Sequence, residues 1–255
     1  MSEIYPLKWT FDLEVSHASI QGFLDSYVPR AIDFIIIEEA EDHGQSSYCW
    51  SSPHLNELTD LSQIVLRAGA LKALYDGAML VHTRGRHIIR PSHGPIELHA
   101  RGALSFVHPS EPFCSDWQQW RYKPDENPVD HFVSASLFQA RYDETIRSIL
   151  ILLGNQNADW ISLYSTLDSL KHVGWDEKKL ARDIGRSAKE FELFMRTANN
   201  SSALGPAARH GQKGWVPPDN PMSLTDAQAL IFECIRCVIK VSGSEIDSRF
   251  RQVLR

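Results

Sequence analysis

Arginine and histidine stand side by side at Arg209 and His210, in an irregular segment between two strongly helical patterns. A guanidinium binds phosphate or carboxylate bidentately, and an imidazole titrates near neutral pH, where it acts as a general acid or base. The segment, residues 199–222, holds three Gly and four Pro. Loops of this length are uncommon inside compact domains and are usually either functional or disordered. If the chain is an enzyme, Arg209 and His210 are its expected catalytic pair.

The same segment also has a structural interpretation, which we favour. Arg209 would then cap helix C-terminal carbonyls or pair with a carboxylate, and so pin the loop to the neighbouring helices. Asn199 and Asn200 stand where the preceding helix should end, and Asn tolerates the left-handed conformation that is common at such ends. We therefore expect the two asparagines to terminate the helix and not to bind a ligand.

A second candidate site is the basic stretch from His82 to Arg101, which holds four Arg and four His against a single acid, Glu97. On a hairpin, cations of this kind could follow a phosphate backbone. The other interpretation is a solvated sheet face. The residues expected to contact phosphate or nucleic acid are Arg84, Arg86, Arg90, His99 and Arg101.

We expect neither a metal nor a cofactor. The histidines of the basic stretch lack the spacing of metal ligands on a helix, and carboxylates are scarce around them. Cys234 and Cys237 form a CxxC pair, but they lie about three turns into a helical pattern, away from the helix N-terminus that would make a thiol reactive. Core packing is the expected role of both cysteines. The chain also lacks a Gly-rich phosphate loop.

Composition and charge narrow the class of protein. The chain has 255 residues, 43% hydrophobic and 23% charged, which disfavours disorder. A net charge of −6 gives no overall attraction to nucleic acid or to anionic membranes, so nucleic acid should bind only through a local basic patch. We expect no signal peptide, because the N-terminus has no cationic start followed by an apolar run. The apolar runs are too short to span a bilayer, and four Cys fit a reducing compartment. We expect a cytoplasmic protein without a membrane segment, whose partner is another protein or a second copy of the chain.

Helices must position most of these residues, because apolar side chains recur at three- and four-residue spacing through much of the chain. Local signals place several helix ends: Thr59 or Asp60 as an N-cap, Gly185 as a stop, and Ser187 with Glu190 at capping-box spacing. The predicted helices cover residues 59–79, 135–153, 159–172, 176–184, 187–198 and 223–241.

Strands are predicted only in the first half. Alternation of apolar and polar residues indicates strands within residues 9–15 and 96–106, the second with a hairpin partner around 85–90. Residues 16–41 have no assigned structure, and the three isoleucines at 35–37 suit a strand or a buried helix equally.

These elements give a fold class of α+β, mainly α. The N-terminal region, residues 1–130, is expected to be mixed α/β with a small antiparallel sheet. Residues 131–255 are expected to form a helical-bundle domain, because antiparallel packing is the simplest way to bury all the apolar stripes.

Four short sequence motifs occur in order in the helical half. They are Trp160-x-x-Leu163-Tyr164, Thr197-Ala198-Asn199, Ala208-Arg209-His210-Gly211 and Pro217-Pro218-x-x-Pro221-Met222-Ser223-Leu224. This combination resembles a widespread group of uncharacterised bacterial proteins with a C-terminal helical domain, and it covers about residues 135–240. The resemblance implies a bundle fold but no established activity.

Helical bundles of this kind also resemble the HEPN superfamily, many of whose members are metal-independent ribonucleases of toxin and anti-phage systems. Those enzymes use an Arg and a His a few residues apart near a helix. Here Arg209 and His210 are adjacent, whereas Arg101 and His108, seven residues apart on a predicted strand, would point to opposite faces. The likeness is at the level of the fold and carries no function by itself.

Two functions follow as hypotheses. The first is a bacterial binding or assembly protein, associated with defence or mobile elements, that acts through contacts and not turnover. The alternative is a metal-independent ribonuclease or nucleotide-binding enzyme that uses Arg209 and His210. An open pocket on which both side chains converge would favour the enzyme, and structural hydrogen bonds would favour the binding protein.

Overall fold

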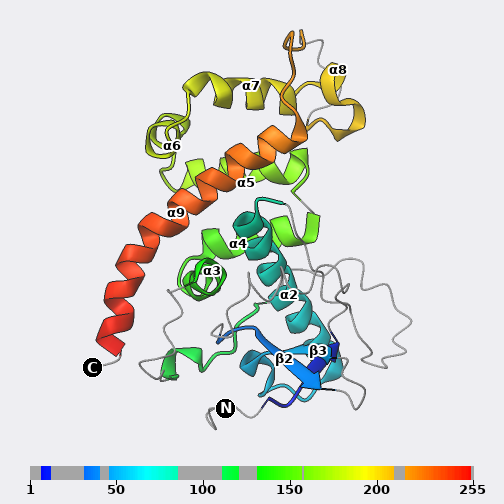
Figure 1. The fold of residues 1–255 in the computed structure, drawn as a ribbon, viewed down its shortest axis with the longest axis vertical. Helices are drawn as coiled ribbons and strands as arrows, with labels where there is room; N and C mark the ends of the chain where they lie inside the picture. The colour runs from blue at the N-terminus through cyan, green and yellow to red at the C-terminus, as the bar shows by residue number, and fades with distance from the viewer. Residues whose placement is uncertain are drawn as a thin grey trace.

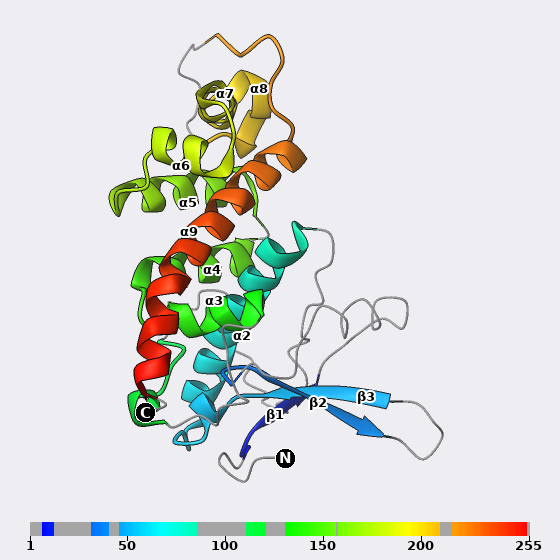
Figure 2. The same cartoon turned by 60° about the vertical axis from the view of Figure 1, so that its left-hand side comes forward.

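The computed structural model describes residues 7–12, 32–40, 46–85, 111–120, 131–156, 158–209 and 216–253, with side chains of the last helix described as far as residue 243. Figures 1 and 2 show helices arranged along the long axis of the molecule, with a small sheet at one end. The fold is α+β and mainly α, which confirms the predicted class. The predicted strand at 96–106 and its hairpin partner lie outside the described residues.

Helices make up most of the described chain. They are α2 (Leu61–Thr83), α3 (Phe132–Ala140), α4 (Glu144–Gln156), α5 (Trp160–His172), α6 (Glu177–Ile184), α7 (Ala188–Ala198), α8 (Ser201–Leu204) and α9 (Leu224–Val253), with short 3₁₀ turns η1 (Pro53–Leu55), η2 (Trp117–Gln119) and η4 (Gly205–Ala207). Helix α9 is the longest of them and runs from the α7–α8 end of the molecule back toward the other end (Figure 1).

Most predicted helix ends are confirmed because their signals are local. The Asp60 carboxylate caps α2 by accepting the Gln63 N–H, and Gly185 ends α6 in the left-handed conformation with φ 72°. Ser187 and Glu190 form the expected capping box. Asn199 ends α7 as its C-cap, which confirms its expected role, but with φ −91° it is not in the left-handed conformation. Asn200 instead starts α8, where its side chain accepts two backbone N–H groups.

One predicted helix was wrong: residues 135–153 form two helices, not one. Helix α3 ends at Ala140, and α4 begins at Glu144 after a short turn. The Asp143 carboxylate accepts the backbone N–H groups of Thr145 and Ile146, which is how an N-cap starts a new helix. Apolar residues continue at helical spacing across this turn, so the periodicity alone did not reveal the break.

The sheet has three antiparallel strands in the order β1-β3-β2, namely β1 (Thr10–Asp12), β2 (Ile35–Ala40) and β3 (Ser46–Ser51). The isoleucines at 35–37 therefore lie in a strand. The Trp50 ring of β3 stacks at 4.5 Å on Phe11 and at 4.4 Å on Phe34. Phe34 in turn stacks at 4.2 Å on Tyr75 of α2. This row of buried rings joins the sheet to the helices.

One hydrophobic core runs through the described chain, from Phe11 of the sheet to Ile239 of α9. Helix α2 packs most extensively against α4, so the core crosses the boundary expected near residue 130. None of the described helices is long and apolar enough to cross a membrane.

The crossing of α2 and α4 has almost no space between the two backbones. A Cβ added to Gly77 would lie against the Leu150 carbonyl oxygen, and one added to Gly154 would lie against the Ala73 carbonyl oxygen. Both collisions are with backbone, which cannot rotate away as a side chain can. Glycine is therefore required at both positions by the approach of the helices, not by an unusual backbone conformation.

We expect Gly154→Ala to lower the free energy of unfolding by about 3 kcal/mol or more, because α2 and α4 must separate to admit the methyl group. Gly69→Ala in α2 is the matched control, since a Cβ there meets nothing within 4 Å. It should raise stability by about 0.5–1 kcal/mol through helix propensity. Urea denaturation of both variants measures the two changes, and equal effects would contradict the close crossing.

Candidate anion-binding site

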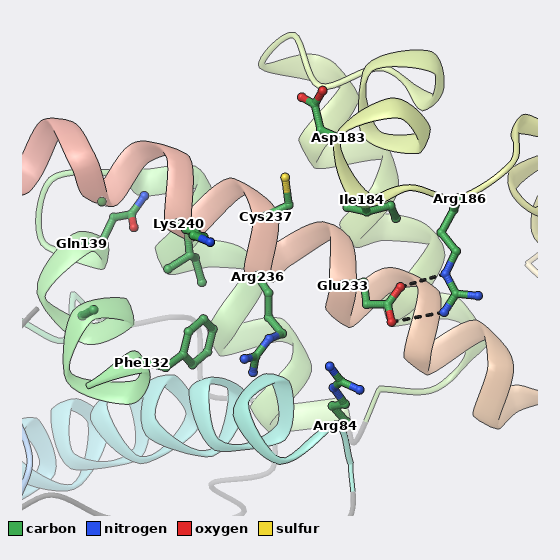
Figure 3. A pocket seen from close by; sticks show the side chains of 13 residues that line it. Arg84, Phe132, Gln139, Asp183, Ile184, Arg186, Glu233, Arg236, Cys237 and Lys240 are labelled. Atoms are coloured by element: carbon green, nitrogen blue, oxygen red, sulfur yellow. Dashed lines mark hydrogen bonds and ion pairs between the residues drawn. The ribbon is translucent and has the colours of Figure 1, made fainter. Parts of the chain in front are cut away.

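A pocket of about 780 Å³ lies where the C-terminal end of α2 meets α3, α6 and α9 (Figure 3). Its volume is within the range of small-molecule sites. The polar residues in its lining are four cations, two acids and one amide, and the apolar ones come mainly from α3 and α9. The lining residues are Arg84, Phe132, Ala135, Gln139, Asp183, Ile184, Arg186, Glu233, Arg236, Cys237, Ile239, Lys240 and Gly243.

Helical spacing explains how α9 and α3 supply this lining. Residues three and four apart share a helix face, and Glu233, Arg236, Lys240 and Gly243 follow that spacing along α9. From Glu233 to Gly243 the face runs for about 15 Å. Phe132, Ala135 and Gln139 follow the same rule on α3, and so the two faces form opposite walls of an elongated pocket (Figure 3).

Glu233 is already neutralised by a cation of the same pocket. Its two oxygens accept hydrogen bonds from Arg186 Nε at 2.9 Å and Nη2 at 3.1 Å, a bidentate pair drawn in Figure 3. This hydrogen bonding raises the pKa of Arg186. The other acid, Asp183, pairs with Arg182 at 2.8 Å. Arg84, Arg236 and Lys240 consequently carry charges that neither pocket acid neutralises through an ion pair within the described residues.

Arg236 is held in place by three contacts, two with carbonyl oxygens and one with an aromatic ring. Its Nη1 donates to the Val81 and His82 carbonyl oxygens at 3.4 and 3.2 Å, at the negative end of α2. Its guanidinium carbon lies 4.7 Å from the centre of the Phe132 ring. Burial and the nearby charge of Arg84 lower the pKa of Arg236, although Glu233 opposes them. The two guanidinium groups thus repel each other in the absence of an anion.

Arg84 occupies a backbone conformation that suits glycine. It ends α2 with φ 55° and ψ 39°, in the left-handed region that costs a non-glycine residue roughly 1–2 kcal/mol. Its exposed side chain makes no hydrogen bond or ion pair to any residue that the structure describes. Neither its backbone nor its repulsion from Arg236 stabilises the fold, so the side chain is better explained by a ligand.

Only two of the site residues predicted from the sequence, Arg84 and Arg209, are among the residues that the structure describes. Arg84 lines the pocket, whereas Arg86, Arg90, His99 and Arg101 lie outside the described residues. Arg209 is not part of the pocket lining.

Arg209 instead has a structural setting on α5. Its Nη2 lies 3.2 Å from the Asp168 carboxylate, and its guanidinium carbon lies 4.1 Å from the centre of the Tyr164 ring. Its backbone N–H donates to the Ala198 carbonyl at 2.9 Å. His210 lies outside the described residues, so the geometry of the pair is not described. The contacts of Arg209 are those of a residue that pins the end of α8–η4 to the bundle.

The CxxC cysteines face different surroundings. Cys234 is fully buried in the core, where burial raises the pKa of its thiol. Cys237 is half-buried and lines the pocket, and burial raises its thiol pKa as well. Among the described residues no group of three or more His, Cys, Asp or Glu side chains is placed to hold a metal ion.

A buried polar cluster was missed entirely by sequence reasoning. Asp33, just before β2, accepts hydrogen bonds from His54 Nε2 at 2.7 Å and from Arg141 Nε at 2.7 Å. The side chains of Asp33, His54 and Arg141 are at most 1% exposed. Their sequence separations of 21 and 108 residues leave no local signal that could have grouped them.

The protonation state of the cluster follows from its hydrogen bonds. His54 Nδ1 accepts the backbone N–H of Cys114 at 3.2 Å, so the proton of a neutral imidazole lies on Nε2 and points at Asp33. Burial lowers the pKa of His54, although Asp33 opposes this. Burial alone would raise the pKa of Asp33, but the Arg141 charge and the His54 hydrogen bond outweigh it, so that pKa is lowered. One anion and one cation, Asp33 and Arg141, therefore balance each other.

This cluster has the order of a Cys–His–Asp triad but not its chemistry. Cys114 Sγ lies 3.2 Å from His54 Nδ1, which is the spacing of a nucleophile and its base. However, burial raises the pKa of the Cys114 thiol to about 12, whereas an active cysteine needs a lowered one. Cys114 is only 3% exposed, and Trp120 stacks on His54 at 4.6 Å. The cluster is a structural one.

Comparison of the chain with family models, with curated proteins and with solved structures gave no match in any of the three. The pocket and the buried cluster must therefore be interpreted from their own geometry.

We expect the free energy of unfolding to fall as the pH drops through about 6.5, because the unfolded chain then protonates His54 while the folded chain does not. The lowered pKa of Asp33 adds a second loss below about pH 4. His54→Asn should cost about 3 kcal/mol at pH 8 and should make the loss between pH 8 and pH 5 smaller.

Urea denaturation at pH 8, 6 and 5 measures both effects. His172→Asn is the control, because it removes an exposed histidine of α5 that lies outside the cluster. His82 also has a pKa lowered by burial, so the His54 variant should retain part of the slope. A pH profile of His54→Asn parallel to that of the wild type would contradict this protonation state.

Proposed function

We propose that the protein is a binding module that takes an anionic ligand in the pocket between α2, α3, α6 and α9, and that it acts through this contact and not through turnover. The observation that carries the proposal is the convergence of Arg84, Arg236 and Lys240 on one cavity, where none of the three forms an ion pair with a described carboxylate. Phosphate and carboxylate groups are the ligands that guanidinium and ammonium groups bind best.

Local charge supports this assignment. Four cations and two carboxylates line the pocket, a net charge of +2, in a chain whose net charge is −6. A concave surface of one sign concentrates ions of the opposite sign, and the field of the rest of the chain would repel them. The left-handed backbone of Arg84 also supports the assignment. Because that conformation is costly for an arginine, the side chain needs a role that compensates for the cost, and binding a ligand is such a role.

The alternative is a metal-independent ribonuclease that uses Arg209 and His210. The contacts of Arg209 with Asp168 and Tyr164 favour the structural role over the catalytic one. A cytoplasmic location, and a protein partner or a second copy of the chain, remain parts of the proposal that we infer from the sequence. So does an association with bacterial defence or mobile elements.

We expect inorganic pyrophosphate to raise the melting temperature, because a ligand that binds only the folded chain adds about 2.7 kcal/mol at one hundred times its Kd. For a chain of this size that is a rise of roughly 5–10 °C. Arg84→Gly should weaken pyrophosphate binding at least tenfold, about 1.4 kcal/mol. It should leave the melting temperature of the free protein nearly unchanged, because relief of strain offsets the greater freedom of unfolded glycine.

The matched control is Lys178→Ala, which removes one exposed cation of α6 that does not line the pocket. It should bind pyrophosphate as the wild type does. Equal losses in the two variants would show that only the overall charge matters, and no binding to the wild type would overturn the proposed function.

A separate experiment tests the ribonuclease alternative. We expect the purified protein to leave RNA intact in EDTA, and Arg209→Ala to lower the free energy of unfolding by about 0.5–1 kcal/mol through loss of an exposed ion pair and a ring contact. Gel analysis of labelled RNA and urea denaturation measure the two outcomes. Cleavage that disappears in a normally stable His210→Ala variant would establish the ribonuclease instead.

A further inference from the structure

Gln139 is a buried amide whose side chain has no hydrogen-bond partner among the described residues. It lies on α3 in the wall of the pocket and is only 1% exposed. Neither its side-chain nitrogen nor its side-chain oxygen has a hydrogen-bond partner within the part of the chain that the structure describes. A buried amide that lacks both bonds is costly to the fold, and most such groups in proteins are paired. Gln139 is therefore a second residue of this pocket, after Arg84, that the fold alone does not explain.

The wall that α9 contributes to this pocket includes a position without a side chain. Gly243 of α9 lines the same pocket, and a Cβ added to it would meet nothing within 4 Å. In Figure 3, Gln139 lies at one end of the pocket and Arg84 lies toward the other, with Arg236 between them. The amide and the two guanidinium groups thus belong to the lining of one cavity.

The two ends of the pocket suit different ligand groups. The Arg84 end needs an anion, as the proposed function states. The Gln139 end suits a neutral group with a donor and an acceptor side by side, because an amide has an NH2 group that donates next to a carbonyl oxygen that accepts. Seven residues of α3 separate Gln139 from Phe132, the ring on which Arg236 lies, and seven helical residues span about 10.5 Å. The ligand must be long enough to bridge that distance.

We infer that the ligand is a nucleotide, with its phosphate on Arg84 and Arg236 and the edge of its base on Gln139. Nucleobases carry adjacent donors and acceptors on their edges, and a Gln side chain can form two hydrogen bonds with such an edge. The sugar spaces the base edge from the phosphate by a length that suits the pocket. This inference rests on the proposed function, since the phosphate uses the anion site.

The experiment compares the 5′-monophosphates of adenosine, guanosine, cytidine and uridine with inorganic phosphate, by isothermal titration calorimetry of the full chain. At least one nucleotide should bind ten or more times as tightly as phosphate. Gln139→Leu, similar in size but apolar, should remove that preference while phosphate binding stays. The melting temperature of the free variant should stay or rise, because an unpaired buried amide is lost. The matched control, Gln63→Leu at an exposed position of α2, should bind like the wild type.

A second variant covers the case in which Gln139→Leu does not fold. Gly243→Leu fills the open space from the facing helix and should reduce nucleotide binding to the affinity for phosphate.

Two failures are distinguishable. If phosphate binds and depends on Arg84, but no nucleotide binds more tightly than phosphate, the inference is wrong and the proposed function stands. If neither phosphate nor any nucleotide binds, both are wrong. A Gln139→Leu variant that is less stable and still prefers the nucleotide would show that the amide serves the fold, which also overturns the inference.

Discussion

The arrangement of the N-terminal region and the helical half depends on the contacts of the Asp33 carboxylate. It is a buried anion that joins the start of β2 to His54 of η1 and to Arg141 after α3. Removing one partner of such a group leaves an uncompensated buried charge, which typically costs 3–5 kcal/mol. The same contact ties down the turn between α3 and α4, because Arg141 lies in that turn and its side chain binds Asp33. The Arg141 guanidinium also lies over the rings of Trp117, Trp120 and Phe138, which bury its charge on the remaining sides.

The pocket depends on this arrangement indirectly, through the directions of the helices that line it. Once the turn at Arg141 separates α3 from α4, α4 can pack along α2 while α3 contacts α9. That leaves Phe132 and Gln139 on the wall facing α9, and Arg84 at the nearby end of α2. The site is thus assembled from four helices whose directions are fixed elsewhere. Its polar residues stabilise the fold little, and two of them oppose it.

The sequence predicted what local chemistry determines. Caps such as Asp60 and Ser187 bond to residues three positions away, so helix ends could be read without knowledge of the fold. The continuous apolar periodicity hid the turn at Arg141, although Asp143 is a local N-cap signal there. The partner of the Arg141 side chain could not be predicted, because Asp33 lies 108 residues earlier. For the same reason Gln139 looked like an ordinary polar residue in an apolar stripe. Arg84 was identified by its charge, and the other predicted residues of the basic stretch lie outside the described residues. Arg236 and Lys240 could not be grouped with Arg84, because they come from a helix about 150 residues away.

The glycine crossing has a consequence for how this fold can change over evolutionary time. Most contacts in a core can drift, since a larger side chain on one helix is matched by a smaller one on the other. No such exchange is open to Gly77 and Gly154, because the atoms that they approach are carbonyl oxygens, which every residue has. Surface charges and loops can be replaced one at a time, but these two positions can only be kept together or lost together with the packing of α2 on α4. A distant relative would therefore be recognised better by two glycines, one on each of two facing helices, than by overall identity.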